Sequence, residues 1–202
     1  MSAYVVAITG ASGALYAQAT LRALKDVGCR IYVTITGPGQ RVLDYELGWL
    51  LTGTPGEKEA RLRQLLGYDA EDSSLRYFDW EDIGALIASG SAKTKGMIIV
   101  PCTMSTLSGI AVGRAGNLIE RAADIMLKER RPLVIVPRET PLNQIHLQNM
   151  LTLAQMGVHI IPAMPAFYHH PQTIDDLANF MVGRVLDVFG LEHELYKRWE
   201  GE

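Results

Sequence analysis

Five cationic side chains lie within eighteen residues of one another in the stretch NLIERAADIMLKERRPLVIVPRETP, residues 117 to 141. They are Arg121, Lys128, Arg130, Arg131 and Arg138, in a chain of 202 residues whose formal net charge is -3. A concentration of Arg and Lys in a chain that is otherwise slightly acidic favours an anionic ligand at this place. The spacing of the five residues decides which of them can reach one ligand together.

Arg121 and Lys128 are spaced to share one face of a helix. Asn117 followed by Glu120 resembles a capping box, which predicts the start of a helix, and residues seven apart are separated by about two turns. Both cations can therefore point at one ligand. Asp124 lies three residues from Arg121 and four from Lys128, so surface ion pairs worth about a few tenths of a kcal/mol explain the same spacing. The spacing leaves both interpretations open.

The other three cations divide into two groups. Arg130 and Arg131 would stand at the C-terminus of that helix, where the helix dipole favours positive charge. Arg138 and Glu139 directly follow the apolar run PLVIVP, which has the pattern of a buried strand. Charges at the end of a buried strand favour a functional role for these two residues.

Short apolar runs alternate with segments of helical periodicity through most of the chain. The runs are rich in Val and Ile and apolar on both faces, as in strands buried on both sides of a parallel sheet. We expect strands at 4–9, 30–36, 96–101, 132–137 and 158–162, and helices at 13–27, 39–51, 117–129, 141–156 and 173–189. This order predicts one α/β domain over residues 1–202: a doubly wound, Rossmann- or flavodoxin-like, mostly parallel sheet with helices on both faces.

The segment from 52 to 92 is less regular. TGTPGEKEARLRQLLGY predicts a turn with a short helix, LRYFDW an edge strand, and ASGSAKTKG a flexible loop. In doubly wound sheets the ligand crevice lies beyond the carboxyl ends of the strands, so the stretches that follow the apolar runs carry most of the functional information. These stretches are TGASGA, TGPGQ, CTMSTLSG, RETP and AMPAFYHH.

TGASGA, from Thr9 to Ala14, joins the first predicted strand to the first predicted helix. Its glycines allow close backbone approach and a helix N-terminus offers free N–H groups to a phosphate, but a tight turn capped by Ser12 would use the same residue types. The stretch lacks the third glycine of the dinucleotide fingerprint, and the second strand ends in Thr36 and Gly37 instead of an acidic residue. A nicotinamide dinucleotide is therefore disfavoured.

A second polar loop follows the strand at 96–101. Thr103, Ser105, Thr106 and Ser108 offer hydroxyl and backbone N–H groups that can hold a polar ligand, although ordinary capping explains them as well. Cys102 beside them has no His or Asp partner at a recognisable spacing, which favours a buried, inert thiol.

Composition and the remaining motifs exclude several classes of protein. The 19 basic and 22 acidic residues include no long run of one sign, so nothing indicates binding to nucleic acid or a membrane. Cys29 and Cys102 are far apart in apolar runs, which argues against a disulfide framework and favours a reducing compartment. His169 and His170 are adjacent and lack metal-ligand spacing, so we expect no metal. With no leader pattern or long apolar stretch, we expect a cytoplasmic protein.

Together these motifs resemble the UbiX-like flavin prenyltransferases, a family of homo-oligomeric, flavodoxin-like flavoproteins. The resemblance rests on TGASGA, ASGS at 88–91, PC..STLSG, NLIERAAD.MLKERRPLV.VPRE.P, IHLQNML, FYHHPQ and the terminal RW. It implies metal-independent transfer of a dimethylallyl group from dimethylallyl phosphate to N5 and C6 of reduced FMN. The product, prenylated FMN, would serve a UbiD-like decarboxylase, and the enzyme would be a homo-oligomer, commonly a dodecamer with sites at subunit interfaces.

The resemblance also implies roles for individual residues. Flavin contacts would be made by Gly10, Ala11, Ser12, Thr36, Thr103, Met104, Ser105, Thr106 and Arg138. Contacts with the prenyl phosphate would be made by Ser89, Arg121, Lys128, Glu139, Tyr168 and Arg184, with Trp199 as a lid in a tail, 190–202, packed over the site or a neighbouring subunit. In this scheme Lys128 stabilises the departing phosphate, Glu139 manages a phosphate proton, and Ser12 and Glu46 handle the proton at N5. Composition alone would make Arg184 a surface charge and Trp199 a tail anchor.

Two other functions fit parts of the pattern. A flavoprotein that oxidatively decarboxylates peptidyl cysteine would share the fold and FMN, but PLNQIHLQNM at 141–150 matches only the Pro and Asn of its PxMNxxMW motif. A non-catalytic FMN-binding or electron-transfer protein would need the flavin loops but not a second cationic cluster. Retained flavin without prenyl transfer would favour that last function.

Overall fold

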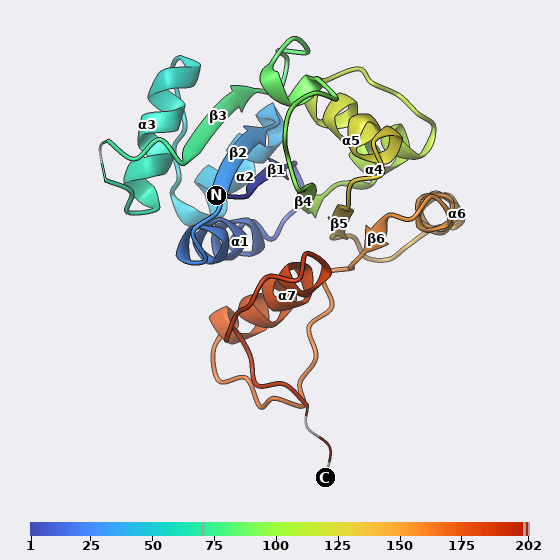
Figure 1. The fold of residues 1–202 in the computed structure, drawn as a ribbon. Coiled ribbons are helices and arrows are strands. Elements are labelled where there is room, and N and C mark those ends of the chain that lie inside the picture. The colour runs from blue at the N-terminus through green and yellow to red at the C-terminus, as the bar shows by residue number, and fades with distance from the viewer. Residues whose placement is uncertain (70, 200, 202) are drawn as a thin grey trace.

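Strands and helices alternate along the chain, as the apolar runs predict (Figure 1). The computed structural model describes residues 1–69, 71–199 and 201. In chain order the elements are β1 (Ala3–Ile8), α1 (Ala14–Asp26), β2 (Arg30–Ile35), α2 (Gly37–Leu47), α3 (Pro55–Leu65), β3 (Leu75–Asp79), the 3-10 turn η1 (Leu86–Ala88), β4 (Gly96–Cys102), α4 (Met104–Ala111), α5 (Leu118–Lys128), β5 (Leu133–Pro137), α6 (Gln144–Gln155), β6 (His159–Ile160) and α7 (Ile174–Val188).

The strands form one parallel sheet in the order β3-β2-β1-β4-β5-β6. The chain winds outward from β1 to β3 and then returns to the other side of β1 to begin β4, so the winding direction reverses between β1 and β4. Loops on the two sides of such a switch point diverge and leave a crevice at the carboxyl ends of the strands. The predicted doubly wound sheet is confirmed, and LRYFDW provides its edge strand β3.

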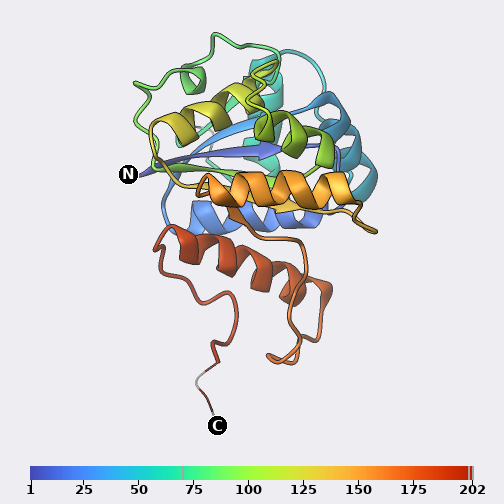
Figure 2. The same ribbon diagram turned by 90° about the vertical axis from the view of Figure 1, so that its right-hand side faces the viewer.

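The sheet separates two apolar cores, which explains why the strand runs are apolar on both faces. Val6 and Ile8 of β1 belong to one core, and Val5 and Ala7 to the other, because successive side chains of a strand point to opposite faces. α1 and α7 cover the first face, while α4, α5 and α6 cover the second. Figures 1 and 2 show α7 and the segments on either side of it extending away from the sheet.

Four local predictions need correction. The stretch after β4, predicted as a polar loop, forms helix α4. α2 ends at Leu47, because Gly48 terminates it in the left-handed conformation with φ 67°. β6 is only two residues long. Asn117 caps α5 as predicted, but the Glu120 carboxylate does not complete a capping box; it is buried and instead accepts hydrogen bonds from Arg114 and from the Gly116 N–H.

Within the described residues, no helix combines the length and the apolar character needed to cross a membrane. Of the predicted tail at 190–202, residues 200 and 202 lie outside the described part of the chain. The rest of the tail returns along α7 and contacts it closely.

Candidate active site

Four strand ends bring the predicted flavin residues to one edge of the sheet. Thr36 follows β2, the segment from Thr103 to Thr106 follows β4, and Arg138 follows β5, while Gly10, Ala11 and Ser12 follow β1. The Thr36 N–H donates to the Ile8 carbonyl at 3.0 Å, and the Arg138 N–H donates to the Cys102 carbonyl at 3.3 Å, so neighbouring loops are tied together. The prediction that the stretches after these strands meet at one edge of the sheet is therefore confirmed.

Gly10 is where the first two of these loops touch. A Cβ built on Gly10 would lie 2.5 Å from the Cβ of Pro38, a distance that no side chain can occupy. Glycine at this position lets the loop after β1 pack directly on the start of α2. The two loops therefore form one surface.

Glu46 on α2 occupies the N-terminus of α1. Its Oε2 accepts hydrogen bonds from the N–H groups of Gly13 at 3.0 Å and Ala14 at 2.7 Å, so the prediction that these groups are free for a phosphate is wrong. The alternative, a helix capped by Ser12, is wrong as well, because Gly13 is the N-cap residue and makes no side-chain cap. A carboxylate from another helix neutralises this end of the dipole.

The same contacts fix the ionisation of Glu46. Burial favours its protonated form, but hydrogen bonds from the Ser12 side chain and from the Ala14 and Gly13 N–H groups, with the charge of Arg138, lower the pKa of Glu46 below its ordinary value. Glu46 is therefore a carboxylate at neutral pH and lies next to Ser12. It can accept a proton but has none to donate.

The N-terminus of α4 remains open at this edge. Thr103 caps the helix by accepting from the Thr106 N–H at 3.2 Å, and its hydroxyl donates to the Thr106 hydroxyl at 3.1 Å. Among the described residues, none accepts a hydrogen bond from the N–H of Met104 or Ser105. Free N–H groups in the first turn of a helix are the groups that bind phosphate.

Thr9 is a site residue that sequence reasoning missed. Its hydroxyl donates to the Pro101 carbonyl and accepts from the Thr103 N–H, both at 2.8 Å, and it is almost fully buried. Thr9 thus ties the end of β1 to the start of α4 across the switch point. A buried Thr at a strand end reads as part of the strand, so the sequence carried no signal for this role.

Arg138 and Glu139 extend the same edge. Arg138 Nε donates to the Ser12 carbonyl at 3.1 Å, which directs the guanidinium toward the loop after β1. Glu139 is exposed, and its Oε1 accepts from the Thr140 N–H at 3.0 Å. Cys102 beneath these loops is fully buried, and burial raises the pKa of its thiol, as expected for an inert cysteine.

Ser89, Arg121 and Lys128 line one cavity of about 440 Å³ between α5 and the segment that follows β3. The prediction that Arg121 and Lys128 share a helix face is therefore confirmed. Asp124 also lines the cavity, but among the described residues neither cation is within ion-pair distance of it; Lys128 instead lies 3.7 Å from Glu129. Arg121 thus makes no ion pair among the described residues and Lys128 makes only this long, exposed one, so both can turn to a ligand.

Arg131 has a role that the helix dipole does not explain. Its guanidinium donates to the carbonyls of Gly90 and Ala92, both at 2.6 Å, and to the Thr94 hydroxyl at 3.1 Å. The segment ASGSAKTKG, predicted to be flexible, is thus fastened to the end of α5. Arg131 holds in place the loop that begins at Ser89.

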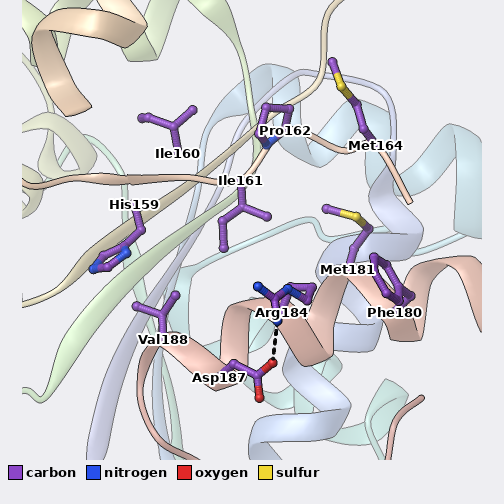
Figure 3. Close-up of a pocket in the computed structure, with 10 residues that line it drawn as sticks. All are labelled: His159, Ile160, Ile161, Pro162, Met164, Phe180, Met181, Arg184, Asp187 and Val188. Atoms are coloured by element: carbon purple, nitrogen blue, oxygen red, sulfur yellow. Dashed lines mark hydrogen bonds and ion pairs between the residues drawn. The ribbon is translucent and has the colours of Figure 1, made fainter. Parts of the chain in front are cut away.

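The remaining donor residues lie on and beside α7. Arg184 is on the α7 side of a cavity of about 640 Å³, facing β6 and the segment after it, and pairs with Asp187 at 3.2 Å (Figure 3). Tyr168 and Trp199 line a smaller neighbouring cavity, and their rings meet edge to face at 5.8 Å. His169 joins no group of three or more metal-ligating side chains among the described residues, and stacks on Phe180 at 5.0 Å.

The two groups of predicted donor residues lie on opposite faces of the sheet. Arg121 and Lys128 are on α5, which packs with α4, whereas Arg184 is on α7, which packs on α1 (Figures 1 and 2). The sheet stands between these layers. Within one chain, the structure therefore does not bring all six predicted phosphate contacts together.

Comparison with known proteins identifies the family. The chain matches the family model described as Flavoprotein over residues 2–186. It is 52% identical over 199 residues to the flavin prenyltransferase UbiX of Halalkalibacterium halodurans, with 98% of this chain and 94% of the relative covered. The flavin prenyltransferase UbiX of Methanothermobacter thermautotrophicus is 46% identical, with 98% and 95% covered. The chain belongs to the UbiX-like flavin prenyltransferase family.

Solved structures of UbiX-like proteins share the whole fold. The crystal structure of AnUbiX (PadA1) in complex with FMN and dimethylallyl pyrophosphate has a TM-score of 0.86 at 38% identity and covers 100% of this chain and 98% of its own. A dodecameric, FMN-dependent UbiX-like decarboxylase from Escherichia coli O157:H7 has a TM-score of 0.85 at 42% identity, with 98% and 100% covered. The cypemycin decarboxylase CypD, at 20% identity, shares only the fold.

Proposed function

We propose that this UbiX-like protein transfers a dimethylallyl group from dimethylallyl phosphate to N5 and C6 of reduced FMN and releases prenylated FMN. The observation that carries this proposal is the cationic cavity of Ser89, Arg121 and Lys128, separate from the flavin loops. A protein that only binds FMN or passes electrons has no use for a second phosphate site. Prenyl transfer needs both the flavin loops and this second, cationic cavity.

The strand-end loops fit FMN. The open N–H groups of Met104 and Ser105, the hydroxyl of Thr106, which accepts from Thr103, and the guanidinium of Arg138 provide donors for a phosphate and for polar ring atoms at one edge. Reduced FMN, when bound there, would supply the electron-rich N5 and C6 positions.

The cations would promote departure of the donor phosphate. As the carbon–oxygen bond of the donor breaks, negative charge grows on the phosphate, and Arg121 and Lys128 stabilise that charge without a metal. Glu139 would manage a phosphate proton. Glu46, which is ionised and lies next to Ser12, is suited to take the N5 proton through the Ser12 hydroxyl.

The site would be completed by other copies of the chain. The predicted donor residues on α5 and α7 lie on opposite faces of one protomer, so a single phosphate can meet all of them only where copies adjoin. Three side chains of α6 support extensive assembly, since Ile145, Leu147 and Leu151 are each more than half exposed. We propose a homo-oligomer with shared sites, namely the dodecamer that is common in the family. Delivery of the product to a UbiD-like decarboxylase and a cytoplasmic location complete the proposal, and the two free cysteines fit a reducing compartment.

The test is anaerobic. The protein is incubated with FMN, a reductant and either dimethylallyl phosphate or the diphosphate, and the mass of the extracted flavin is measured. We expect a gain of one C5H8 unit, and a loss of at least tenfold in rate for Lys128→Ala but not for Arg130→Ala, which removes a neighbouring cation that does not line the cavity. Unchanged FMN with both donors would instead indicate an FMN-binding protein.

A further inference from the structure

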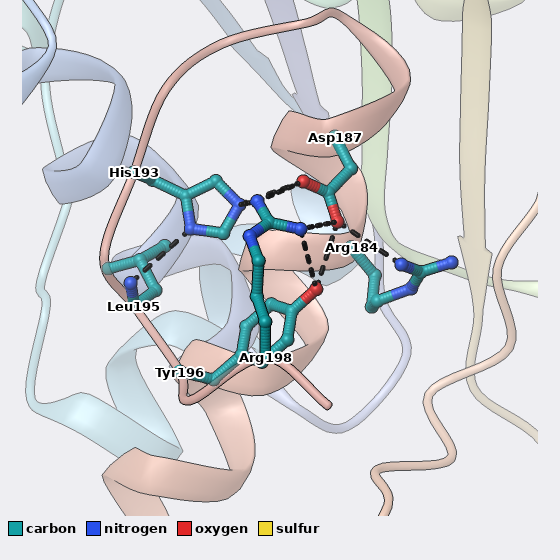
Figure 4. A network of polar contacts seen from close by, with 6 residues as sticks. All are labelled: Arg184, Asp187, His193, Leu195, Tyr196 and Arg198. Carbon is teal, nitrogen blue, oxygen red and sulfur yellow. Dashed lines mark hydrogen bonds and ion pairs between the residues drawn. The ribbon is translucent and has the colours of Figure 1, made fainter. Parts of the chain in front are cut away.

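The tail after α7 is fastened to that helix by a single carboxylate. Asp187 Oδ1 accepts hydrogen bonds from Arg198 at 2.6 Å and from His193 Nε2 at 3.1 Å, while Oδ2 accepts from the Tyr196 hydroxyl at 2.9 Å (Figure 4). Oδ2 also accepts from Arg184 at 3.2 Å. We call Asp187 and these four partners the tail latch.

The helix is shaped to receive the tail. Phe180, Gly183 and Asp187 recur at intervals of three and four residues, so they lie on one face of α7. A Cβ built on Gly183 would lie 2.5 Å from the Tyr196 ring and 2.7 Å from the His193 ring, so only glycine allows both rings to sit on the helix. Phe180 meets the Tyr196 ring at 4.9 Å. The tail is therefore seated by packing as well as by charge.

The path of the tail leads to the proposed donor site. From Asp187 the tail crosses the helix at Gly183 and Phe180 and brings Trp199 against Tyr168. The carboxylate that fastens the tail also fixes Arg184. One group thus orients both a predicted phosphate ligand and the residue predicted to close over the donor.

We propose that Asp187 is a positioning residue for the prenyl donor, which sets the place of Arg184 and, through the tail latch, of Trp199. This inference rests on the proposed function. Asp187 does not touch the reacting atoms, and its carboxylate opposes the charge of Arg184. A residue that only screened that charge would weaken phosphate binding, whereas a positioning residue strengthens it, so the two roles predict opposite effects of removing the charge.

The test compares Asp187→Asn with Glu194→Gln, which makes the same change of charge at an exposed tail residue whose side chain makes no hydrogen bond or ion pair with the described residues of the latch. We expect Asp187→Asn to raise the KM for dimethylallyl phosphate about tenfold with little change in kcat or in FMN affinity, because the three tail contacts of Asp187 all lose the charge of its carboxylate. Tyr196→Phe removes one of the tail contacts of Asp187 and leaves those of Arg198 and His193, so it should raise KM only two- to threefold. Glu194→Gln should leave KM unchanged. A lowered KM for Asp187→Asn would overturn the proposal.

A second readout does not depend on catalysis. With 5-fluorotryptophan incorporated, the fluorine resonance of Trp199, assigned from its loss in Trp199→Phe, should sharpen and shift in Asp187→Asn but not in Glu194→Gln. If the parent protein failed to prenylate FMN, the proposed function would fail, and the resonance would still decide whether the latch holds the tail. If the parent transferred the prenyl group and Asp187→Asn changed neither KM nor the resonance, the latch alone would be refuted.

Discussion

The contacts of Arg131 predict how stably the loop that begins at Ser89 is held against the end of α5. Arg131→Ala removes two bonds of 2.6 Å to the Gly90 and Ala92 carbonyls. Each is a charge-assisted hydrogen bond in a partly buried place, worth about 1.5 kcal/mol, so the free energy of opening this loop should fall by about 3 kcal/mol. Since about 1.4 kcal/mol is a factor of ten, the population of the open loop should rise about a hundredfold.

Hydrogen–deuterium exchange of the peptide covering residues 86–95 measures this opening. The Ala92 N–H donates to the Ser89 carbonyl and the Thr94 N–H to the Ala92 carbonyl, so both amides should exchange about a hundredfold faster in Arg131→Ala. Arg130→Ala is the matched control, because Arg130 is the adjacent, exposed cation and donates to none of these carbonyls. Equal exchange in the two variants would refute the assignment of loop order to Arg131.

Three further outcomes follow from the flavin edge. Gly10→Ala should lower FMN affinity at least tenfold, because the new Cβ would lie 2.5 Å from Pro38 and force the two loops apart. Gly37→Ala is the control, since no atom lies within 4 Å of its new Cβ, and it should leave the FMN affinity nearly unchanged. Fluorescence titration measures both affinities. Glu46→Gln should lower the free energy of unfolding above about pH 4.5, because the ionised carboxylate of Glu46 stabilises the folded protein. Urea titrations of variant and parent should show this difference vanishing as the pH falls through the lowered pKa of Glu46 in the folded protein, where the carboxylate becomes protonated. Cys102 should resist iodoacetamide in the native protein and react only after unfolding, as mass spectrometry of the labelled peptide would reveal, because its thiol is fully buried.

The position of the predicted flavin residues at one edge of the sheet was predictable, because it depends only on where the strands end. Apolar runs fixed where β1, β2, β4 and β5 end, and the carboxyl ends of parallel strands share one edge, so the neighbourhood of Thr36, Thr103 and Arg138 required no knowledge of packing. The occupant of the α1 N-terminus was not predictable. Glu46 lies 33 residues from Gly13 along the chain, and nothing in its surroundings in the sequence reveals which backbone groups it meets. The tail latch was not predictable either, because an Asp near the end of a helix is typical of a side chain that faces solvent.

The donor residues show where reasoning from periodicity stops. A spacing of seven residues correctly placed Arg121 and Lys128 on one face of α5, but periodicity gives the direction of a helix face only relative to its own axis. It cannot state that α5 and α7 cover opposite faces of the sheet, because that depends on the crossovers of the chain. On the proposed function, the predicted flavin residues lie together at one edge of each protomer, whereas the predicted donor residues of α5 and α7 can share one phosphate only where copies meet. A grip on the prenyl phosphate by both α5 and α7 would therefore require assembly.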